Sequence, residues 1–70
     1  MNIKNIKRYL FSKLGSNILV IYYGSRNKKE LYRGVLWKLY GNIFTIKLSN
    51  GELKSFTYID ILTKTIQICI

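Results

Sequence analysis

The sequence predicts a mainly β fold: a small barrel of about five antiparallel strands, with an N-terminal α-helix and a short helical turn before the last strand. Three observations support this prediction. Short apolar segments with strand periodicity follow one another from residue 17, Asn50-Gly51 stands between two of them, and no proline interrupts them. Seventy residues form a single domain, so we expect a helix in residues 1–15 and a barrel in residues 17–70.

The N-terminal segment has the pattern of an amphipathic helix. Ile3, Ile6, Leu10 and Leu14 recur at spacings of three and four, which places them in one apolar stripe. Asn2 can cap the N-terminus of this helix, and Gly15 is a natural stop. Basic residues take up much of the remaining helix surface: Lys4, Lys7, Arg8 and Lys13.

The period changes to that of β-strands after the helix. Residues 18–23 are continuously apolar, which is typical of a strand covered on both faces. In the long strand after the loop of residues 24–29, alternation places Trp37 on the same face as Val35, and we expect Trp37 to fill the barrel. Gly34 in the middle of this strand indicates a bulge or a sharp bend.

The next two strands are predicted to form a hairpin. Phe44, Ile46 and Leu48 alternate with polar residues, so we expect a half-buried strand with Phe44 in the core. Asn50-Gly51 between two strands is the strongest short hairpin signal that a sequence can carry.

The last part of the chain completes the predicted barrel. Residues 53–58 form a strand with Phe56 facing inward, and residues 58–62 form a single helical turn that Asp60 is expected to cap. Residues 66–70 then alternate as the closing strand. A short turn before the last strand is how SH3-like and Sm-like barrels cross between sheets, and closure would remove the strand edges.

These motifs resemble the Veg family of small bacterial proteins over nearly the whole chain. Residues 56–66, Phe-Thr-Tyr-Ile-Asp-Ile-Leu-Thr-Lys-Thr-Ile, resemble the family's most distinctive block, Tyr-Ser-Tyr-Ala-Asp-Val-Leu-Thr-x-Thr-Val. Residues 5–10, Asn-Ile-Lys-Arg-Tyr-Leu, resemble its opening, and residues 34–36, Gly-Val-Leu, resemble its Gly-Ile-Leu. The resemblance implies an SH3-like or Sm-like barrel and a regulator, not an enzyme, labelled as a stimulator of biofilm formation.

The charge of the chain is strongly positive. Twelve basic and three acidic residues give a net charge of +9. This implies an anionic partner, most often nucleic acid and more rarely a membrane surface or an acidic protein. A low-GC genome that enriches Lys, Asn and Ile would produce a similar composition without a functional reason.

Catalysis, cofactors and metal sites are not predicted. The chain has no histidine, so general acid–base chemistry would fall to Glu30, Glu52 and Asp60. Cys69 is the only cysteine, which excludes an intramolecular disulfide and a cysteine-rich metal site. No apolar run approaches the roughly 18 residues of a membrane span, and no signal peptide is recognisable, so we expect a cytoplasmic protein.

The leading candidate for binding is the basic loop with Arg26, Lys28 and Lys29, because loops held by a rigid barrel often carry binding. Its aromatic and basic neighbours, Tyr23 and Arg33, strengthen this hypothesis. A solvated turn that blunts a strand edge is the alternative. The helix offers a second basic surface with three candidate residues: Lys4, Lys7 and Arg8.

Two functions remain open from the sequence. The first is a regulatory module that binds nucleic acid, with RNA favoured over duplex DNA. The second is a protein-binding modulator that docks on a transcriptional repressor or another acidic partner, without contacting nucleic acid. Copies of the chain could also assemble through their strand edges.

Overall fold

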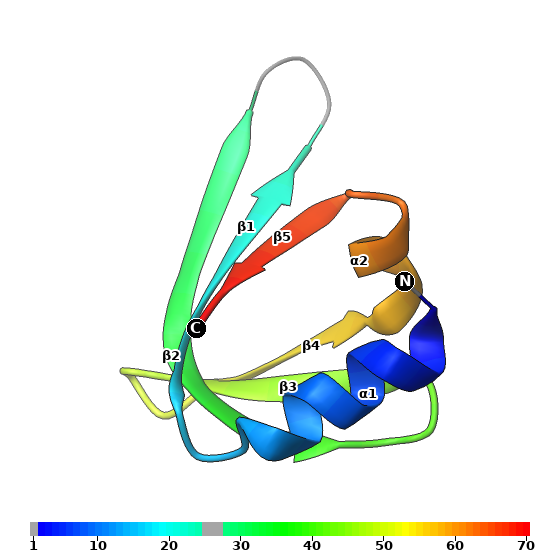
Figure 1. Cartoon of the computed structure of the whole chain (residues 1–70). Helices are drawn as coiled ribbons and strands as arrows, with labels where there is room; N and C mark the ends of the chain where they lie inside the picture. Colours follow the sequence, from blue (N-terminus) through cyan, green and yellow to red (C-terminus); the bar gives the residue numbers. More distant parts are fainter. Residues whose placement is uncertain (1, 25–27) are drawn as a thin grey trace.

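Five strands and two helices make up the computed structural model, which describes residues 2–24 and 28–70 (Figure 1). In chain order the elements are α1 (Ile3–Ser12), β1 (Asn17–Tyr23), β2 (Lys29–Leu39), β3 (Ile43–Leu48), β4 (Leu53–Thr57), α2 (Tyr58–Leu62) and β5 (Ile66–Cys69). The strands form one antiparallel sheet in the order β4-β3-β2-β1-β5. The predicted mainly β fold, with an N-terminal helix and a short helix before the last strand, is therefore confirmed.

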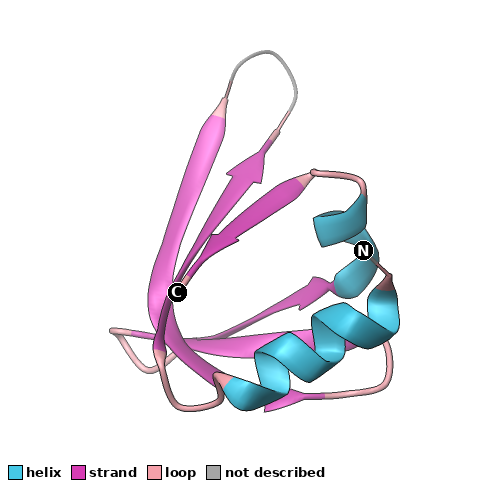
Figure 2. Ribbon diagram, viewed as in Figure 1, coloured by secondary structure: helices cyan, strands magenta, loops and turns pink. Residues whose placement is uncertain are grey.

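The sheet bends sharply, so its two halves face each other like the sides of a wedge (Figure 2). Strand β2 belongs to both halves, because it pairs with β1 in one half and with β3 in the other. Both helices lie on the inner side of the sheet, and α2 connects the two edge strands β4 and β5. The helices thus cover the side of the barrel where β4 and β5 do not pair.

The core fills the inside of this bent sheet. Ile6 and Leu10 of α1 are buried, as the helical stripe predicts, whereas Leu14 lies beyond the end of α1 and is exposed. The predicted core residues Phe44 and Phe56 are also buried, with ring centroids 5.7 Å apart. Tyr58 of α2 stacks on Phe44 at 5.9 Å, so the short helix is tied to the sheet by its first residue.

The prediction that Trp37 fills the barrel is wrong, because the face that it shares with Val35 is the outer face of the sheet, and a β-bulge in β2 separates it from Leu39. Leu36 pairs with Ile46 and Lys38 pairs with Thr45, so Trp37 is the extra residue on its strand. Up to Trp37 the strand alternates regularly, so Leu36 is fully buried and Trp37, on the same face as Val35, is 44% exposed. Beyond the bulge the alternation is reversed, and Leu39 packs against the core. The bulge thus lies beyond Gly34, which the sequence had singled out for a bulge or a bend.

Gly34 lies where β2 passes from one half of the sheet to the other. It pairs with Ile18 of β1 and with Leu48 of β3. A Cβ atom at this position would lie 2.9 Å from the carbonyl carbon of Lys47 and closer still to its oxygen. The bend therefore requires a residue without a side chain at this position.

Two further details differ from the sequence predictions. Ile18 and Val20 of β1 are buried, but Leu19 and Ile21 are only half-buried, so this strand is not covered on both faces. Thr57, not Asp60, caps α2, because its Oγ1 accepts a hydrogen bond from the backbone N–H of Asp60 at 3.2 Å.

The predicted cap and hairpin are present. Asn2 accepts a hydrogen bond from the backbone N–H of Asn5 at 2.8 Å, and Gly15, after the helix, has a φ of 85°. In the β3–β4 turn, Gly51 has a φ of 89°, and its N–H donates to the carbonyl of Leu48 at 2.9 Å. This is the three-residue hairpin loop in which a left-handed glycine completes the turn.

Tyr58 gives the fold a measurable dependence on alkaline pH. Its side chain is 1% exposed, and its hydroxyl donates to the carbonyl of Tyr40 at 2.7 Å. Burial raises the pKa of this hydroxyl above its usual value of 10.0. The Tyr58 hydroxyl therefore holds its proton more tightly in the folded state than in the unfolded chain. The stability that this difference contributes is complete below pH 10 and is lost as the pH rises through the folded pKa.

We expect Tyr58→Phe to cost about 1 kcal/mol at neutral pH, because the Tyr40 carbonyl loses its partner. We also expect stability to fall less steeply above pH 10 in this variant than in the wild type. Urea unfolding at pH 7 and at pH values above 10 measures both effects, and the exposed Tyr9→Phe serves as the control. Equal alkaline slopes in wild type and Tyr58→Phe would contradict the assignment.

Candidate nucleic-acid interface

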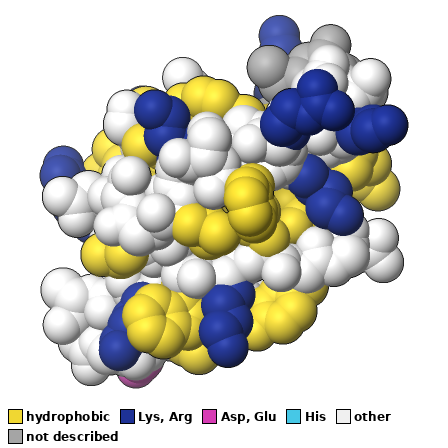
Figure 3. All heavy atoms as spheres, turned by 60° about the horizontal axis from the view of Figure 1, so that its bottom comes forward, with side chains coloured by type: hydrophobic (Ala, Val, Ile, Leu, Met, Phe, Trp, Pro, Cys, Tyr) yellow, Lys and Arg dark blue, Asp and Glu magenta, His cyan; other side chains and the backbone are white. Residues whose placement is uncertain are grey.

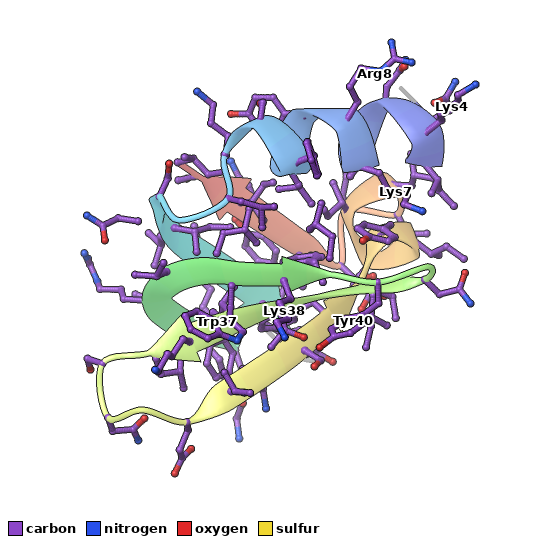
Figure 4. The ribbon with its side chains drawn as sticks, turned by 90° about the horizontal axis from the view of Figure 1, so that it is seen from below. Lys4, Lys7, Arg8, Trp37, Lys38 and Tyr40 are labelled. Atoms are coloured by element: carbon purple, nitrogen blue, oxygen red, sulfur yellow. The ribbon has the colours of Figure 1, made fainter. Side chains whose placement is uncertain are left out.

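The bulge places aromatic and basic side chains together on the outside of the sheet. Trp37, Lys38 and Tyr40 come from the end of β2 and the residue after it, and Lys47 comes from the neighbouring strand β3. We call these four residues the Trp37 strip. Trp37, Lys38 and Tyr40 follow one another along the face that is turned toward the viewer in Figure 4. Trp37 and Lys38 both face outward because the bulge interrupts the alternation between them.

Lys47 and Trp37 form the tightest cation–π contact of the described residues. The Lys47 ammonium lies 4.6 Å from the centroid of the Trp37 ring. Trp37 is 44% exposed and Tyr40 is 51% exposed, so both rings are accessible to a ligand. Exposed aromatic faces beside ammonium groups are the combination that holds single-stranded nucleic acid, whose bases stack while its phosphates bind cations.

Lys7 of α1 contacts the β2–β3 turn, next to the last residue of the strip. Its Nζ donates to the carbonyl of Gly41 at 3.3 Å and lies 5.7 Å from the centroid of the Tyr58 ring. In Figure 4 Lys7 points toward the β2–β3 turn, whereas Lys4 and Arg8 point away from the sheet. The structure therefore separates the three predicted helix residues: Lys7 lies beside the strip, and Lys4 and Arg8 form an exposed surface elsewhere.

A shallow groove of about 690 Å³ continues the strip across the outer face of the sheet. Trp37, Lys47 and the predicted residue Arg33 line it together. Its floor is apolar and includes Leu19 and Val35. An apolar slot with two cations and an indole at its rim can hold a flat ring and an adjacent anionic group.

The predicted loop site is a separate location. Lys28 and Lys29 are exposed, and the Lys29 ammonium lies 5.9 Å from the centroid of the Tyr23 ring. The hydroxyl of Tyr23 donates to Gln67 Oε1 at 2.8 Å, which fixes the ring beside β5. Arg26, the leading candidate of the sequence, lies outside the described residues. Lys29 begins β2 and Trp37 lies near the other end of this strand, so the two sites are far apart along β2 (Figure 1).

The charge around the strip is almost entirely positive. Hydrophobic and basic side chains are interspersed over the face in Figure 3, and acidic groups show only at its margin. The Glu30 carboxylate accepts a hydrogen bond from the Tyr32 hydroxyl, and this bond raises the pKa of Tyr32. With three acidic residues for twelve basic ones, most of the basic side chains have no acidic counterpart.

A metal site and a membrane-spanning helix are not observed in residues 2–24 and 28–70. In this part of the chain, no group of three or more His, Cys, Asp or Glu side chains could hold a metal ion. Within the same residues, no helix has the length and apolar character needed to cross a membrane.

The strip was not a predicted site, although Arg33 and Lys7 at its borders were. Simple alternation assigned Trp37 to the core and left Lys38 and Lys47 without a role. One signal was available: Leu36 and Leu39 are both apolar and three residues apart, which a regular strand cannot bury on one face. A bulge between them resolves this conflict, and both side chains then pack inside.

Comparison with known proteins identifies a family. A search of curated proteins finds no relative of this chain. The family model described as "Biofilm formation stimulator VEG" matches residues 1–69, which is nearly the whole sequence. A match to this family suggests a regulator related to biofilm formation, as the resemblance of residues 56–66 implied. The chain belongs to the VEG family.

Proposed function

We propose that this protein is a non-enzymatic regulator that binds single-stranded nucleic acid through the Trp37 strip, with RNA favoured over duplex DNA. The observation that carries the proposal is the Lys47 ammonium 4.6 Å from the centroid of the Trp37 ring, on the outside of the sheet. A large aromatic residue at such a position exposes apolar surface to water at a cost, and a stacking ligand would offset that cost.

The shape of the strip supports a single strand over a duplex. Trp37 and Tyr40 present ring faces, and ring faces can stack only on bases that are splayed out of a helix. Lys38 and Lys47 lie beside these rings, where they can contact the phosphates that follow a stacked base. Duplex DNA hides its base faces, so it would meet only the positive charge.

Three double variants with equal charge test where nucleic acid binds. Lys38→Ala/Lys47→Ala alters the strip, Lys4→Ala/Arg8→Ala alters the outer face of α1, and Arg26→Ala/Lys28→Ala alters the loop. Each lowers the net charge from +9 to +7. Fluorescence anisotropy with labelled single-stranded RNA, single-stranded DNA and duplex DNA, over a range of salt concentrations, compares them.

We expect only the strip variant to lose phosphate contacts. Its log–log dependence of affinity on salt should become shallower by about 1.4, because each phosphate contact on a single strand contributes about 0.7. The other two variants should keep nearly the wild-type slope.

Other outcomes identify other sites. Equal losses in all three variants would show nonspecific attraction to a +9 protein, and loss in the loop variant alone would make the loop the site. Absence of binding at physiological salt would overturn the proposal and favour an acidic protein as the direct partner.

A further inference from the structure

Strand β5 has backbone groups that pair with no strand in the described part of the sheet. It is the last strand in the order β4-β3-β2-β1-β5 and pairs only with β1. The N–H of Tyr23 donates to the carbonyl of Thr65 at 2.9 Å, and in this register Ile21 and Gln67 form the next hydrogen-bonded pair. The N–H and C=O groups of Ile66 and Ile68 must then point to the unpaired side.

An apolar groove of about 540 Å³ runs beside this edge. Ile6 and Tyr9 of α1 form one wall, Ile61 of α2 closes one end, and Ile66 and Ile68 of β5 form the other wall. The groove therefore combines a free strand edge with a place for apolar side chains. These are the two features by which a sheet binds an extended peptide.

The rim of the groove is basic. Lys64 lines it directly. Two more ammonium groups lie against tyrosines that line it: Lys13 lies 5.9 Å from the Tyr9 ring centroid, and Lys29 lies 5.9 Å from the Tyr23 ring centroid. No acidic residue belongs to the lining. Charge complementarity therefore selects an acidic ligand.

We propose that the β5 edge and this groove form a docking site for an extended acidic segment of another protein. The segment adds a strand to β5, its alternate apolar side chains enter the groove, and its carboxylates meet Lys64, Lys13 and Lys29. A second copy of this chain is a poorer occupant. The other edge strand of the described sheet, β4, carries Lys54, and each copy has a net charge of +9. The site shares no residue with the Trp37 strip and does not depend on the nucleic-acid proposal.

Two synthetic peptides of opposite charge test the site. One alternates valine with glutamate and the other alternates valine with lysine, and each is titrated into the ¹⁵N-labelled full-length protein. We expect the acidic peptide to slow hydrogen exchange of the Ile66 and Ile68 amides at least tenfold, because they gain acceptors. The basic peptide should leave both amides unchanged.

Substitutions on β5 distinguish pairing at the edge from general attraction. Ile68→Pro removes an N–H that faces the unpaired side and leaves the bonds between β5 and β1 in place, so it should weaken acidic-peptide binding at least tenfold. Ile68→Val keeps the N–H and is the matched control. Lys64→Asn should weaken binding about threefold by removing one rim charge, and asparagine tolerates the φ of 62° at this position.

Several results would overturn the inference. Two of these results are equal binding of the two peptides and amide changes away from β5. The third is self-association that Ile68→Pro abolishes, because it would show that a second copy covers the edge. If Ile68→Pro does not fold, the amide map and Lys64→Asn still decide the question. Peptide binding that survives Trp37→Ala separates this site from the nucleic-acid strip.

Discussion

Replacing Gly34 by alanine is expected to prevent the domain from folding. The added Cβ would lie 2.9 Å from the Lys47 carbonyl carbon and closer to its oxygen, and both atoms belong to the backbone of the adjacent strand. To relieve this clash, β2 and β3 would have to separate at the bend that joins the two halves of the sheet. Overpacking of this kind costs about 3 kcal/mol or more, and a domain of this size has about 3–5 kcal/mol in total.

Far-UV circular dichroism and urea unfolding measure this effect. Gly41→Ala is the matched control, because a Cβ at Gly41 has no neighbour within 4 Å and the backbone there is not left-handed. It should change stability by no more than about 0.5 kcal/mol. Wild-type stability in Gly34→Ala would show that the two strands are not held at this separation.

Replacing Trp37 by alanine is expected to abolish most nucleic-acid affinity and to leave the fold intact. Loss of one stacked base costs about 1–3 kcal/mol, which corresponds to a decrease in affinity of about 5- to 150-fold. Stability should fall by only about 1 kcal/mol, since the ring is partly exposed and its contact with Lys47 lies at the surface. By comparison, Phe44→Ala in the core should cost about 3–5 kcal/mol.

Titrations with single-stranded RNA at physiological salt compare Trp37→Ala with two controls. Phe11→Ala removes an aromatic ring that is 68% exposed on α1 and should bind like the wild type. Trp37→Tyr keeps a stacking face and should recover much of the affinity. Trp37 is the only tryptophan, so quenching of its fluorescence on binding gives a direct readout in the wild type. Normal binding by Trp37→Ala, or unfolding of this variant, would contradict the surface role.

The segments whose structure depends on local patterns were predictable. The stripe of Ile6 and Leu10 with the Asn2 cap specified α1, because helix periodicity and capping act within a few residues. The alternation around Phe44 specified β3, and Asn50-Gly51 marked the turn to β4.

The candidate sites were less predictable, because each depends on how distant strands meet. The loop and helix residues were chosen mainly for their charge and position in the sequence. Among the predicted binding residues that the structure describes, Lys7 and Arg33 lie beside the strip.

The cap of α2 also differed from the prediction. Thr57 and Asp60 both have side chains that can cap a helix, and the position of the strand end before α2 gives this role to Thr57. The groove beside β5 requires α1, α2 and β5 together, and no local pattern describes it.

Composition and periodicity were enough to define a basic, mainly β domain with its helices and strands in this order, since charge and local hydrogen bonding need no knowledge of distant contacts. Tertiary packing decided that the face shared by Val35 and Trp37 is the outer one, and the register between β2 and β3 placed Lys38 beside Trp37 on that face. One extra residue in a strand reverses every side chain beyond it, and the fit of Leu36 and Leu39 into a shared core selects where that residue lies. The surface proposed to bind nucleic acid therefore depends on which face of β2 packs inward and on where the bulge lies, and only the packed sheet determines both.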